Sequence, residues 1–206
     1  LRDVRQHEMD RIIFLDFDAT NEIGDKILLT VCVEIMGKYS NMILIKDGRV
    51  VDALKRVDFT TSSVRQILPG IEYKLPLQQG KLSLEDCQTD SIVDRIISNP
   101  DKKLSGAVMD AMQGVSPVIS REISYIVTGD DAPVYSLNEC DISELTEILD
   151  NIKRKLHNDF SVYMLKDQNG KPKDLAHMSI KQYDGMLEQQ VYDSPSELLD
   201  DFYYER

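Results

Sequence analysis

The chain has 206 residues and a formal net charge of −12, from 24 Lys and Arg against 36 Asp and Glu. Apolar residues make up 42% and charged residues 29%, a globular composition that excludes a mainly disordered chain. No apolar run approaches the roughly 20 residues that a membrane-spanning helix needs. The three cysteines and three histidines lack the spacing of a zinc site, so we expect no metal and no cofactor.

The chain starts with LRDVRQHEMD, which has neither an initiator Met nor the apolar core of a signal peptide. We therefore expect a piece of a longer protein, and the sparse, odd cysteine count suits the reducing cytoplasm. Residues 1–81 carry 12 basic and 12 acidic side chains, whereas residues 82–206 carry 12 basic and 24 acidic ones. This excess of acid argues against a nucleic-acid surface over the later part as a whole, but not over the earlier part.

The earlier part has the pattern of short strands. β-Branched and aromatic residues gather in four runs that end in tight turns, and these runs cover residues 11–17, 27–35, 41–45 and 50–51. A turn is expected at residues 21–25, and Asp47-Gly48 between two apolar runs predicts a hairpin because both residues tolerate positive φ. The pattern predicts an antiparallel meander, half of a sandwich or a barrel.

The later part has the pattern of helices. Pro69-Gly70, Pro76 and the Gln78–Gly80 stretch mark a linker, so we place a β-rich domain at 1–81 and a mainly helical domain at 82–206. Amphipathic spacing predicts helices over residues 90–98, 103–112, 116–127 and 143–156. A strand at 160–165 that returns over 174–180 predicts a small hairpin, and Ser194 caps a last helix that runs to Tyr203. The expected fold class is α+β.

One motif joins two of these helices tightly. A helix that ends near Gly114 is followed by Val115 and by Ser116, which caps the next helix, while Pro117 takes its first position. This arrangement is typical of a helix-hairpin-helix unit, in which Gly114, Val115 and Ser116 could contact a phosphate. Ser116 stands where the usual hairpin has a second glycine. The alternative is a plain packing corner between two helices.

Two polar clusters flank the expected strands. Asp10-Arg11 precedes the first strand, where the arginine could meet a phosphate and the aspartate could orient it; the alternative is a solvated strand entrance. The turn from Glu34 to Asn41 combines a conformationally flexible glycine, a cation, an aromatic ring and two small polar side chains, namely Gly37, Lys38, Tyr39, Ser40 and Asn41. Such a turn could bind a phosphate and stack on a base, or it could be an ordinary solvated β-turn.

Further cations follow along the β-rich part. Lys55, Arg56 and Arg65 could extend a strip that contacts phosphates, or they could protect an edge strand. There is no P-loop, nucleophile elbow or plausible catalytic triad. The paired carboxylates Asp16/Asp18 and Asp200/Asp201 read as surface acids. We therefore expect a binding module and not an enzyme.

Several strings in order resemble the NFACT family, and the match covers nearly the whole chain. These strings are EMDRIIFLDF, EIGDKILLTVCVEIMGKYSNMILI, IKDGRVVDALKRV, SSVRQILPGIEYKLP, GVSPVISREI and SPSELLDDFYYER. The resemblance implies the later part of an NFACT-N domain, similar in fold to MutM-type DNA glycosylases, followed by a helix-hairpin-helix domain. The family's N-terminal segment, coiled coil and NFACT-R domain have no counterpart here.

The resemblance also implies a function. Bacterial family members bind obstructed large ribosomal subunits and recruit alanyl-tRNA, so that the stalled chain receives an alanine tail. The family's Asp-Arg pair for tRNA recruitment corresponds to Asp10-Arg11, and its turn motif corresponds to Glu34–Asn41, with Tyr39 where histidine is expected. The implied partners are tRNA and the large ribosomal subunit, with no membrane and no DNA. Two alternatives are a fibronectin-binding adhesin, after an older name in the family, and an enzyme related to DNA glycosylases.

Overall fold

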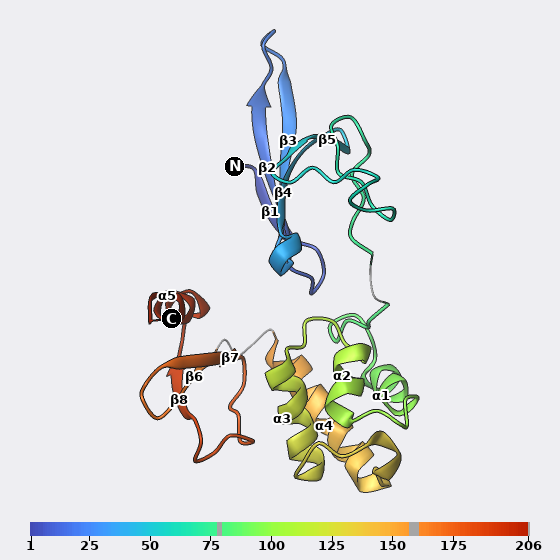
Figure 1. Cartoon of the computed structure of the whole chain (residues 1–206), viewed down its shortest axis with the longest axis vertical. Coiled ribbons are helices and arrows are strands. Elements are labelled where there is room, and N and C mark those ends of the chain that lie inside the picture. Colours follow the sequence, from blue (N-terminus) through green and yellow to red (C-terminus); the bar gives the residue numbers. More distant parts are fainter. Residues whose placement is uncertain (78–79, 157–160, 206) are drawn as a thin grey trace. The chain divides into compact units, whose positions relative to one another are not determined.

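The computed structural model describes residues 1–77, 80–156 and 161–205, and the chain forms two compact units, Leu1–Gly80 and Lys81–Arg206 (Figure 1). The division lies one residue before the boundary expected from the linker. Both units contain an antiparallel sheet and the second adds helices, so the fold is of the α+β class. In the described part of the chain, no helix is long and apolar enough to cross a membrane.

The first unit is built on a five-stranded antiparallel meander. Its strands follow the chain in order across the sheet: β1 (Asp3–Gln6), β2 (Ile12–Thr20), β3 (Lys26–Glu34), β4 (Asn41–Lys46) and β5 (Arg49–Ala53). Asp47 and Gly48 have φ of 50° and 72°, as the Asp-Gly turn predicts. Sequence reasoning missed β1, because all four of its side chains are exposed and its residues show no apolar alternation.

One face of this sheet carries the core of the unit. The buried apolar side chains are Ile12, Phe14, Cys32, Ile43, Ile45, Val50 and Ile67. The segment that follows β5 lies to one side of the sheet (Figure 1) and contributes Val57, Ile67 and Tyr73 to this cluster. Val57 and Ile67 exchange both backbone hydrogen bonds, which closes this segment into a loop over the sheet. The segment therefore replaces a second sheet on that face.

The opposite face of the same sheet is also apolar but belongs to no core cluster. The strand register places its side chains side by side across β2, β3 and β4. We call these residues the open apolar face: Ile13, Leu15, Phe17, Ala19, Ile27, Leu29, Val31, Val33, Met42 and Leu44. All of them are half-buried except Met42, which is exposed.

In its described residues, the second unit contains four α-helices around one core and a small sheet with a fifth α-helix. The helices are α1 (Thr89–Ile97), α2 (Leu104–Ala111), α3 (Pro117–Thr128), α4 (Glu139–Lys155) and α5 (Pro195–Glu205). The sheet has the order β7-β6-β8, from β6 (Val162–Lys166), β7 (Pro172–Ala176) and β8 (Glu188–Tyr192). Fully buried residues from α1 to α4, such as Ile92, Leu104, Ile123 and Leu145, form the main core, and α5 packs Leu198 and Phe202 against Met164 and Tyr192.

The helix caps explain where these helices begin. Ser116 accepts a hydrogen bond from the Ile119 N–H and Pro117 takes the first position of α3, as the sequence predicts. Helix α4 begins at Glu139, four residues before the expected start, because Asn138 and Asp141 form a reciprocal capping box. The motif places Ser194 as the cap of α5, and its hydroxyl accepts a hydrogen bond from the Glu197 N–H. Strand β8 was missed because its residues, EQQVY, are mainly polar.

The remaining expectations differ only at the ends of elements. Helix α2 ends at Ala111, one residue before the end of the helix expected over 103–112 and three residues before Gly114, whose φ of 70° marks the turn beyond it. The expected strand at 160–165 corresponds to β6, which starts at Val162, and Phe160 lies outside the described residues. The linker residues Gln78 and Gln79 also lie outside them.

Candidate nucleic-acid interface

The turn between β1 and β2 presents Arg11 to solvent. The Arg11 carbonyl accepts a hydrogen bond from the Ile35 N–H at 2.9 Å, so the turn lies beside the end of β3. The Asp10 carboxylate accepts a hydrogen bond from the backbone N–H of Arg11 at 2.8 Å, and the Gln6 side chain donates to the Asp10 carbonyl. Among the described residues, the exposed Arg11 guanidinium has no ion-pair partner within 4.0 Å. Asp10 thus fixes the backbone from which Arg11 projects.

The turn after β3 places Lys38 and Tyr39 at the same end of the sheet. It forms the short 3₁₀-helix η1 (Gly37–Tyr39), in which Gly37 adopts φ of 57°, a left-handed conformation that favours glycine. The Lys38 ammonium lies 4.9 Å from the centroid of the Tyr39 ring. Both side chains are exposed, Tyr39 at 71%, so neither is needed for packing. A cation over one face of an exposed aromatic ring is suited to a phosphate, and the other face of the ring to an adjoining base.

Ser40 and Asn41 have structural roles in this turn. The Ser40 hydroxyl accepts the Met36 N–H at 2.9 Å. Asn41 is only 5% exposed; its amide donates to the Lys55 carbonyl at 2.8 Å and its side-chain oxygen accepts the N–H groups of Met42 and Lys55. Both side chains therefore shape the turn and join it to the chain after β5.

This junction brings Lys55 to the same place. The Lys55 ammonium donates to the Lys38 carbonyl at 3.1 Å, so two lysines from distant parts of the sequence lie together. Arg56 follows but is held by an exposed ion pair with Asp52 at 3.1 Å. Arg56 donates a hydrogen bond to the Asp52 carboxylate, and this bond is the main reason why the pKa of this carboxyl lies below its usual range. The hydrogen bond from the Ala53 N–H has a smaller effect in the same direction. We call the end of the sheet that carries Arg11, Lys38 and Lys55 the cationic end.

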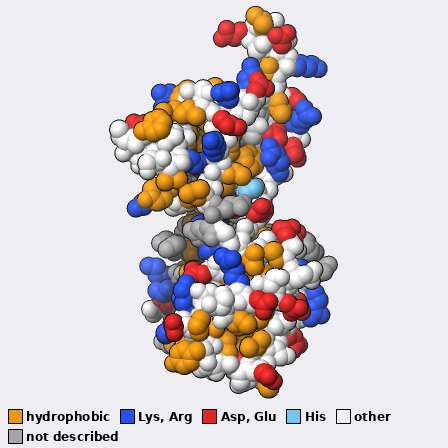
Figure 2. Space-filling model, turned by 90° about the vertical axis from the view of Figure 1, so that its right-hand side faces the viewer, with side chains coloured by type: hydrophobic (Ala, Val, Ile, Leu, Met, Phe, Trp, Pro, Cys, Tyr) orange, Lys and Arg blue, Asp and Glu red, His pale blue; other side chains and the backbone are white. Residues whose placement is uncertain are grey.

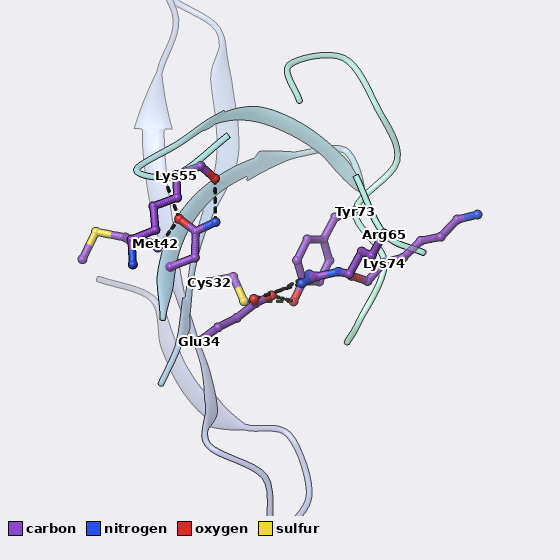
Figure 3. Close-up of polar contacts among 8 residues, drawn as sticks. Cys32, Glu34, Met42, Lys55, Arg65, Tyr73 and Lys74 are labelled. Atoms are coloured by element: carbon purple, nitrogen blue, oxygen red, sulfur yellow. Dashed lines mark hydrogen bonds and ion pairs between the residues drawn. The ribbon is translucent and has the colours of Figure 1, made fainter. Parts of the chain in front are cut away.

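Arg65 does not lie at the surface of this end. Its guanidinium forms a bidentate pair with Glu34, at 3.0 and 2.5 Å, and its Nε donates to the Lys74 carbonyl (Figure 3). Glu34 is 2% exposed and the Arg65 side chain 16%. The Tyr73 hydroxyl donates to Glu34 at 2.9 Å and lies 3.1 Å from the Cys32 sulfur, so four polar side chains form one buried network. Arg65 thus neutralises a buried carboxylate, and its charge is not free for a phosphate.

Burial sets the protonation of this network. It raises the pKa of the Cys32 thiol to about 11 and raises the pKa of the Tyr73 hydroxyl as well, so both stay protonated at neutral pH. Burial acts to lower the pKa of Arg65, but the hydrogen bonds and charge of Glu34 outweigh it and the pKa rises. The network therefore has a fixed charge distribution, which is typical of a structural site.

The sequence contained a signal for this pair. Glu34 lies two residues after the buried Cys32 in the same strand, and side chains two residues apart point to the same face of a sheet. The Glu34 carboxylate is therefore expected on the covered face. A buried carboxylate needs a cation, which makes one of the later arginines its partner. Reading Glu34 as part of the turn hid this inference.

Of the paired carboxylates, Asp18, Asp200 and Asp201 are exposed, as expected of surface acids, but Asp16 is not. Asp16 is buried, accepts a hydrogen bond from the Thr30 hydroxyl at 2.5 Å and pairs with Arg5. The Thr30 bond, more than Arg5, holds the pKa of this carboxyl below its usual range although burial opposes the shift. Asp18, in contrast, pairs with Arg2 at the surface. The prediction of a surface acid was wrong for Asp16, because this residue lies two positions after the buried Phe14 in β2 and points to the same covered face.

Gly114, Val115 and Ser116 belong to the second unit. Gly114 is exposed, and Val115 and Ser116 are half-buried. The backbone of this connection is tied to the start of the unit, since the Leu82 N–H donates to the Ala111 carbonyl and the Gln113 N–H to the Leu82 carbonyl. Because the Ser116 hydroxyl already accepts one of the first amides of α3, fewer amides are left for an anion.

The comparisons with known proteins agree on one family. The model of the NFACT N-terminal and middle domains matches residues 1–206. The Rqc2 homolog RqcH of Bacillus subtilis (strain 168) is 36% identical over 121 residues, which are 58% of this chain and 21% of the relative. The Rqc2 homolog RqcH of Streptococcus suis (strain 05ZYH33) is 40% identical over 85 residues, 40% of this chain and 15% of the relative. This chain thus spans about a fifth, or less, of the curated relatives it matches.

Two solved structures share the fold over nearly the whole chain. The fibrinogen binding protein from Staphylococcus aureus has a TM-score of 0.77 and 27% identity, over 98% of this chain and 69% of that chain. The N-terminal part of the fibronectin/fibrinogen-binding protein from Streptococcus suis has a TM-score of 0.69 and 25% identity, over 99% and 67%. Because the family model extends over the whole chain, this chain belongs to the NFACT family and corresponds to its N-terminal and middle domains.

Proposed function

We propose that this chain is an RNA-binding module, without a catalytic site of its own, and that the cationic end of its first sheet binds tRNA. The observation that carries the proposal is the convergence of Arg11, Lys38 and Lys55, with the exposed ring of Tyr39, at one end of one sheet. Lysine and arginine supply the electrostatic attraction to phosphates, and the ring supplies a stacking surface.

The mixed charge of the unit suits a local contact. On the side drawn in Figure 2, Lys and Arg side chains of the first unit (upper part) alternate with hydrophobic and acidic ones. Asp10 and Asp52 lie among the cations of the cationic end as well, and Arg56 is neutralised by Asp52. A few phosphates at a defined place are therefore a better ligand for this end than a long duplex.

The family supports a wider role for the parent protein. We propose that it acts in the cytoplasm in ribosome quality control, binds obstructed large ribosomal subunits and recruits alanyl-tRNA for alanine tailing of stalled chains. Two relatives carry the name Rqc2 homolog RqcH, which supports this role. In this proposal the first unit is the later part of a MutM-like domain, and α2 and α3 form a helix-hairpin-helix unit whose residues 114–116 contact a phosphate.

The test is tRNA binding by matched variants. Fluorescently labelled alanine tRNA is titrated with this chain and with its longer parent, as wild type, Arg11→Ala/Lys38→Ala and the control Lys26→Ala/Lys46→Ala. The control removes the same charge from the other end of strands β3 and β4. Loss of two charged contacts should weaken binding by about a hundredfold or more, because each such contact is worth about 1.5–3 kcal/mol. Equal affinities for the two double variants would refute the cationic end as the tRNA site.

A second candidate is binding of fibronectin or fibrinogen. The two solved structures with the same fold carry these ligands in their names, which favours it. Immobilised fibronectin and fibrinogen, with albumin as control, would test it by surface plasmon resonance. Saturable binding that survives Arg11→Ala/Lys38→Ala would assign this activity to a surface other than the cationic end.

A further inference from the structure

The Asn41 side chain continues the pairing of β4 with β5 beyond the last residue of β5. Strand β5 ends at Ala53, and the Leu54 N–H still donates to the Met42 carbonyl at 2.8 Å. One residue later, the Asn41 amide donates to the Lys55 carbonyl and accepts the Lys55 N–H, each at 2.8 Å (Figure 3). Two such bonds to one residue are the pattern of a hydrogen-bonded pair in an antiparallel sheet. The side chain therefore fixes the backbone of Lys55 as a neighbouring strand would.

This bonding leaves the Asn41 amide little capacity for a ligand. Its oxygen also accepts the Met42 N–H at 2.9 Å, so both of its acceptor positions are used. Its nitrogen donates to the Lys55 carbonyl, and the residue is almost completely buried. Asn41 can therefore influence a ligand only through the residue that it holds.

The Lys55 side chain is held at both ends. Asn41 fixes its backbone, and its ammonium donates to the Lys38 carbonyl at 3.1 Å. An exposed lysine usually samples many rotamers and loses this freedom when it binds a ligand. Here much of the ordering precedes binding, and the ammonium has two further hydrogens that can donate to a phosphate. The Lys55 charge is therefore pre-organised.

Other hydrogen bonds hold the remaining cations in the same frame. The Ser40 hydroxyl accepts the Met36 N–H at 2.9 Å and closes the turn that carries Lys38. The next strand end joins this turn, because the Ile35 N–H donates to the Arg11 carbonyl at 2.9 Å. Three segments that are distant in the sequence thus hold their cations in one arrangement, in which Ser40 and Asn41 supply the side-chain bonds to the backbone of the turn.

A fixed arrangement of cations favours phosphates at fixed positions. A folded RNA holds its phosphates in a defined arrangement, and it is recognised largely by that shape. A flexible single strand can instead bring its phosphates to cations in many arrangements, so its affinity follows the number of charges. The geometry of the cationic end should therefore matter for a folded RNA and matter little for a flexible one.

We propose that Asn41, together with Ser40, is a positioning residue that fixes Lys55 and Lys38, so that the cationic end selects a folded RNA over a flexible single strand. The proposal rests on the proposed function, because it concerns the same surface. Neither Asn41 nor Ser40 contacts a phosphate in it. The alternative is that Asn41 only maintains the fold of the first unit.

Parallel titration with two RNAs tests this selectivity. Labelled alanine tRNA and a poly(U) strand of the same length are titrated with the parent protein as wild type, Asn41→Ala and the control Asn21→Ala. Asn21 holds a turn in a similar way at the other end of β3, where its amide oxygen accepts the N–H groups of Ile23 and Asp25. Circular dichroism and thermal unfolding identify the variants that are folded.

Asn41→Ala should weaken tRNA binding by about fivefold, since Lys55 must then be ordered when the RNA binds. Its affinity for poly(U) should stay within about twofold of wild type, because no charge is lost. Asn21→Ala should keep both affinities within about twofold. Ser40→Ala removes one hydrogen bond from the turn and should weaken tRNA binding by about threefold without affecting poly(U), which gives a decision even if Asn41→Ala does not fold.

A double-mutant cycle shows whether Asn41 acts through Lys55. Lys55→Ala should weaken the binding of both RNAs, because a charge is lost. Asn41→Ala added to Lys55→Ala should then cost tRNA binding less than about a further twofold, whereas a purely structural role would cost the same factor in both backgrounds.

Equal losses for tRNA and poly(U), an unchanged tRNA affinity in a folded Asn41→Ala variant, or an undiminished effect in the Lys55→Ala background would overturn the positioning role. The proposed function is tested separately by Arg11→Ala/Lys38→Ala. If that variant weakens tRNA binding while Asn41→Ala and Ser40→Ala do not, the positioning role fails and the tRNA site stands. If it leaves tRNA binding unchanged, the tRNA site fails and the positioning role fails with it.

Discussion

Arg65 has a different role in the structure from the one that the sequence predicts. As one of several cations in a basic stretch it resembles a phosphate ligand, but its guanidinium neutralises Glu34 in the interior. Glu34 in turn accepts a hydrogen bond from Tyr73, which adjoins Cys32. The network links β3 to the segment that covers the sheet and therefore stabilises the unit that carries the cationic end.

Arg65→Ala should lower the free energy of unfolding of the first unit by about 3 kcal/mol, because it leaves the Glu34 carboxylate buried and uncompensated. Arg56→Ala removes an arginine from an exposed pair and should cost less than about 1 kcal/mol. Urea denaturation followed by circular dichroism measures both. Similar, small losses would mean that Glu34 is hydrated and that the pair is not a structural element.

The same network predicts a loss of stability at alkaline pH. The pKa of Cys32 rises from 9.0 in the unfolded chain to about 11 in the fold, so the folded state keeps a proton that the unfolded state releases. Stability should be constant below pH 9 and fall between pH 9 and 11, by up to about 1.4 kcal/mol per pH unit for one proton. Cys32→Ser keeps a hydroxyl for Tyr73 and removes this titration, so its decline should be shallower. An identical decline in wild type and Cys32→Ser would assign the effect to other groups.

Asp10 is expected to act through the backbone of Arg11. Its carboxylate accepts the Arg11 N–H, and an asparagine can accept the same bond without the charge. Asp10→Asn should therefore keep tRNA affinity within about twofold, while Asp10→Ala should lose about fivefold, which is about 1 kcal/mol for one hydrogen bond. Filter binding with alanine tRNA measures both. If Asn is as damaging as Ala, the charge of Asp10 and not its turn geometry matters.

At the scale of elements, two glycines without neighbours within 4 Å of an added Cβ separate backbone strain from packing. Gly48 in the β4–β5 turn has φ of 72°, whereas Gly106 lies inside α2. Gly48→Ala should cost the unit about 1–2 kcal/mol because an L-residue is strained there. Gly106→Ala should instead stabilise by about 0.5–1 kcal/mol through its helix propensity. Thermal unfolding checks both signs, and a stabilising Gly48→Ala would contradict the assigned turn.

Most elements could be predicted because their signals are local. The Asp47-Gly48 turn, the Ser116–Pro117 start of α3 and the apolar runs of β2 to β4 each depend on a few adjacent residues. Strand β1 could not be predicted, since it forms by pairing with β2 and buries no side chain of its own. Strand β8 is likewise an edge strand that pairs with β6.

The candidate site was predictable only in part for the same reason. Arg11, Lys38, Tyr39 and Lys55 were each identified from sequence, and the meander brings the ends of their strands together. The burial of Asn41 depends on its bonds to Lys55, fourteen residues away, and the pairing of Arg65 depends on Glu34, thirty-one residues away. Such contacts are set by tertiary structure and leave no mark in the spacing of neighbouring residues.

In the whole molecule, the two units differ in their net charge and in the kinds of secondary structure that they contain. The acidic excess lies in the second unit, which consists of helices and a small sheet, and the cationic end lies on the first. The first unit presents two distinct surfaces, the cationic end and the open apolar face, which share no residue. Under the proposed function, the RNA contact lies on the unit in which acidic and basic side chains nearly balance.

The salt dependence of tRNA binding is the sharpest test of whether the cationic end contacts tRNA phosphates. Affinity for alanine tRNA is measured between 50 and 200 mM salt for wild type, for Arg11→Ala/Lys38→Ala/Lys55→Ala and for the control Lys26→Ala/Lys46→Ala/Arg49→Ala. Each phosphate contact adds nearly one to the slope of log affinity against log salt. If the cationic end contacts tRNA phosphates, the slope of the first triple variant should be smaller than that of wild type by about 2–3, and the control should keep the wild-type slope. Equal slopes for all three proteins, or a loss confined to the control, would contradict it.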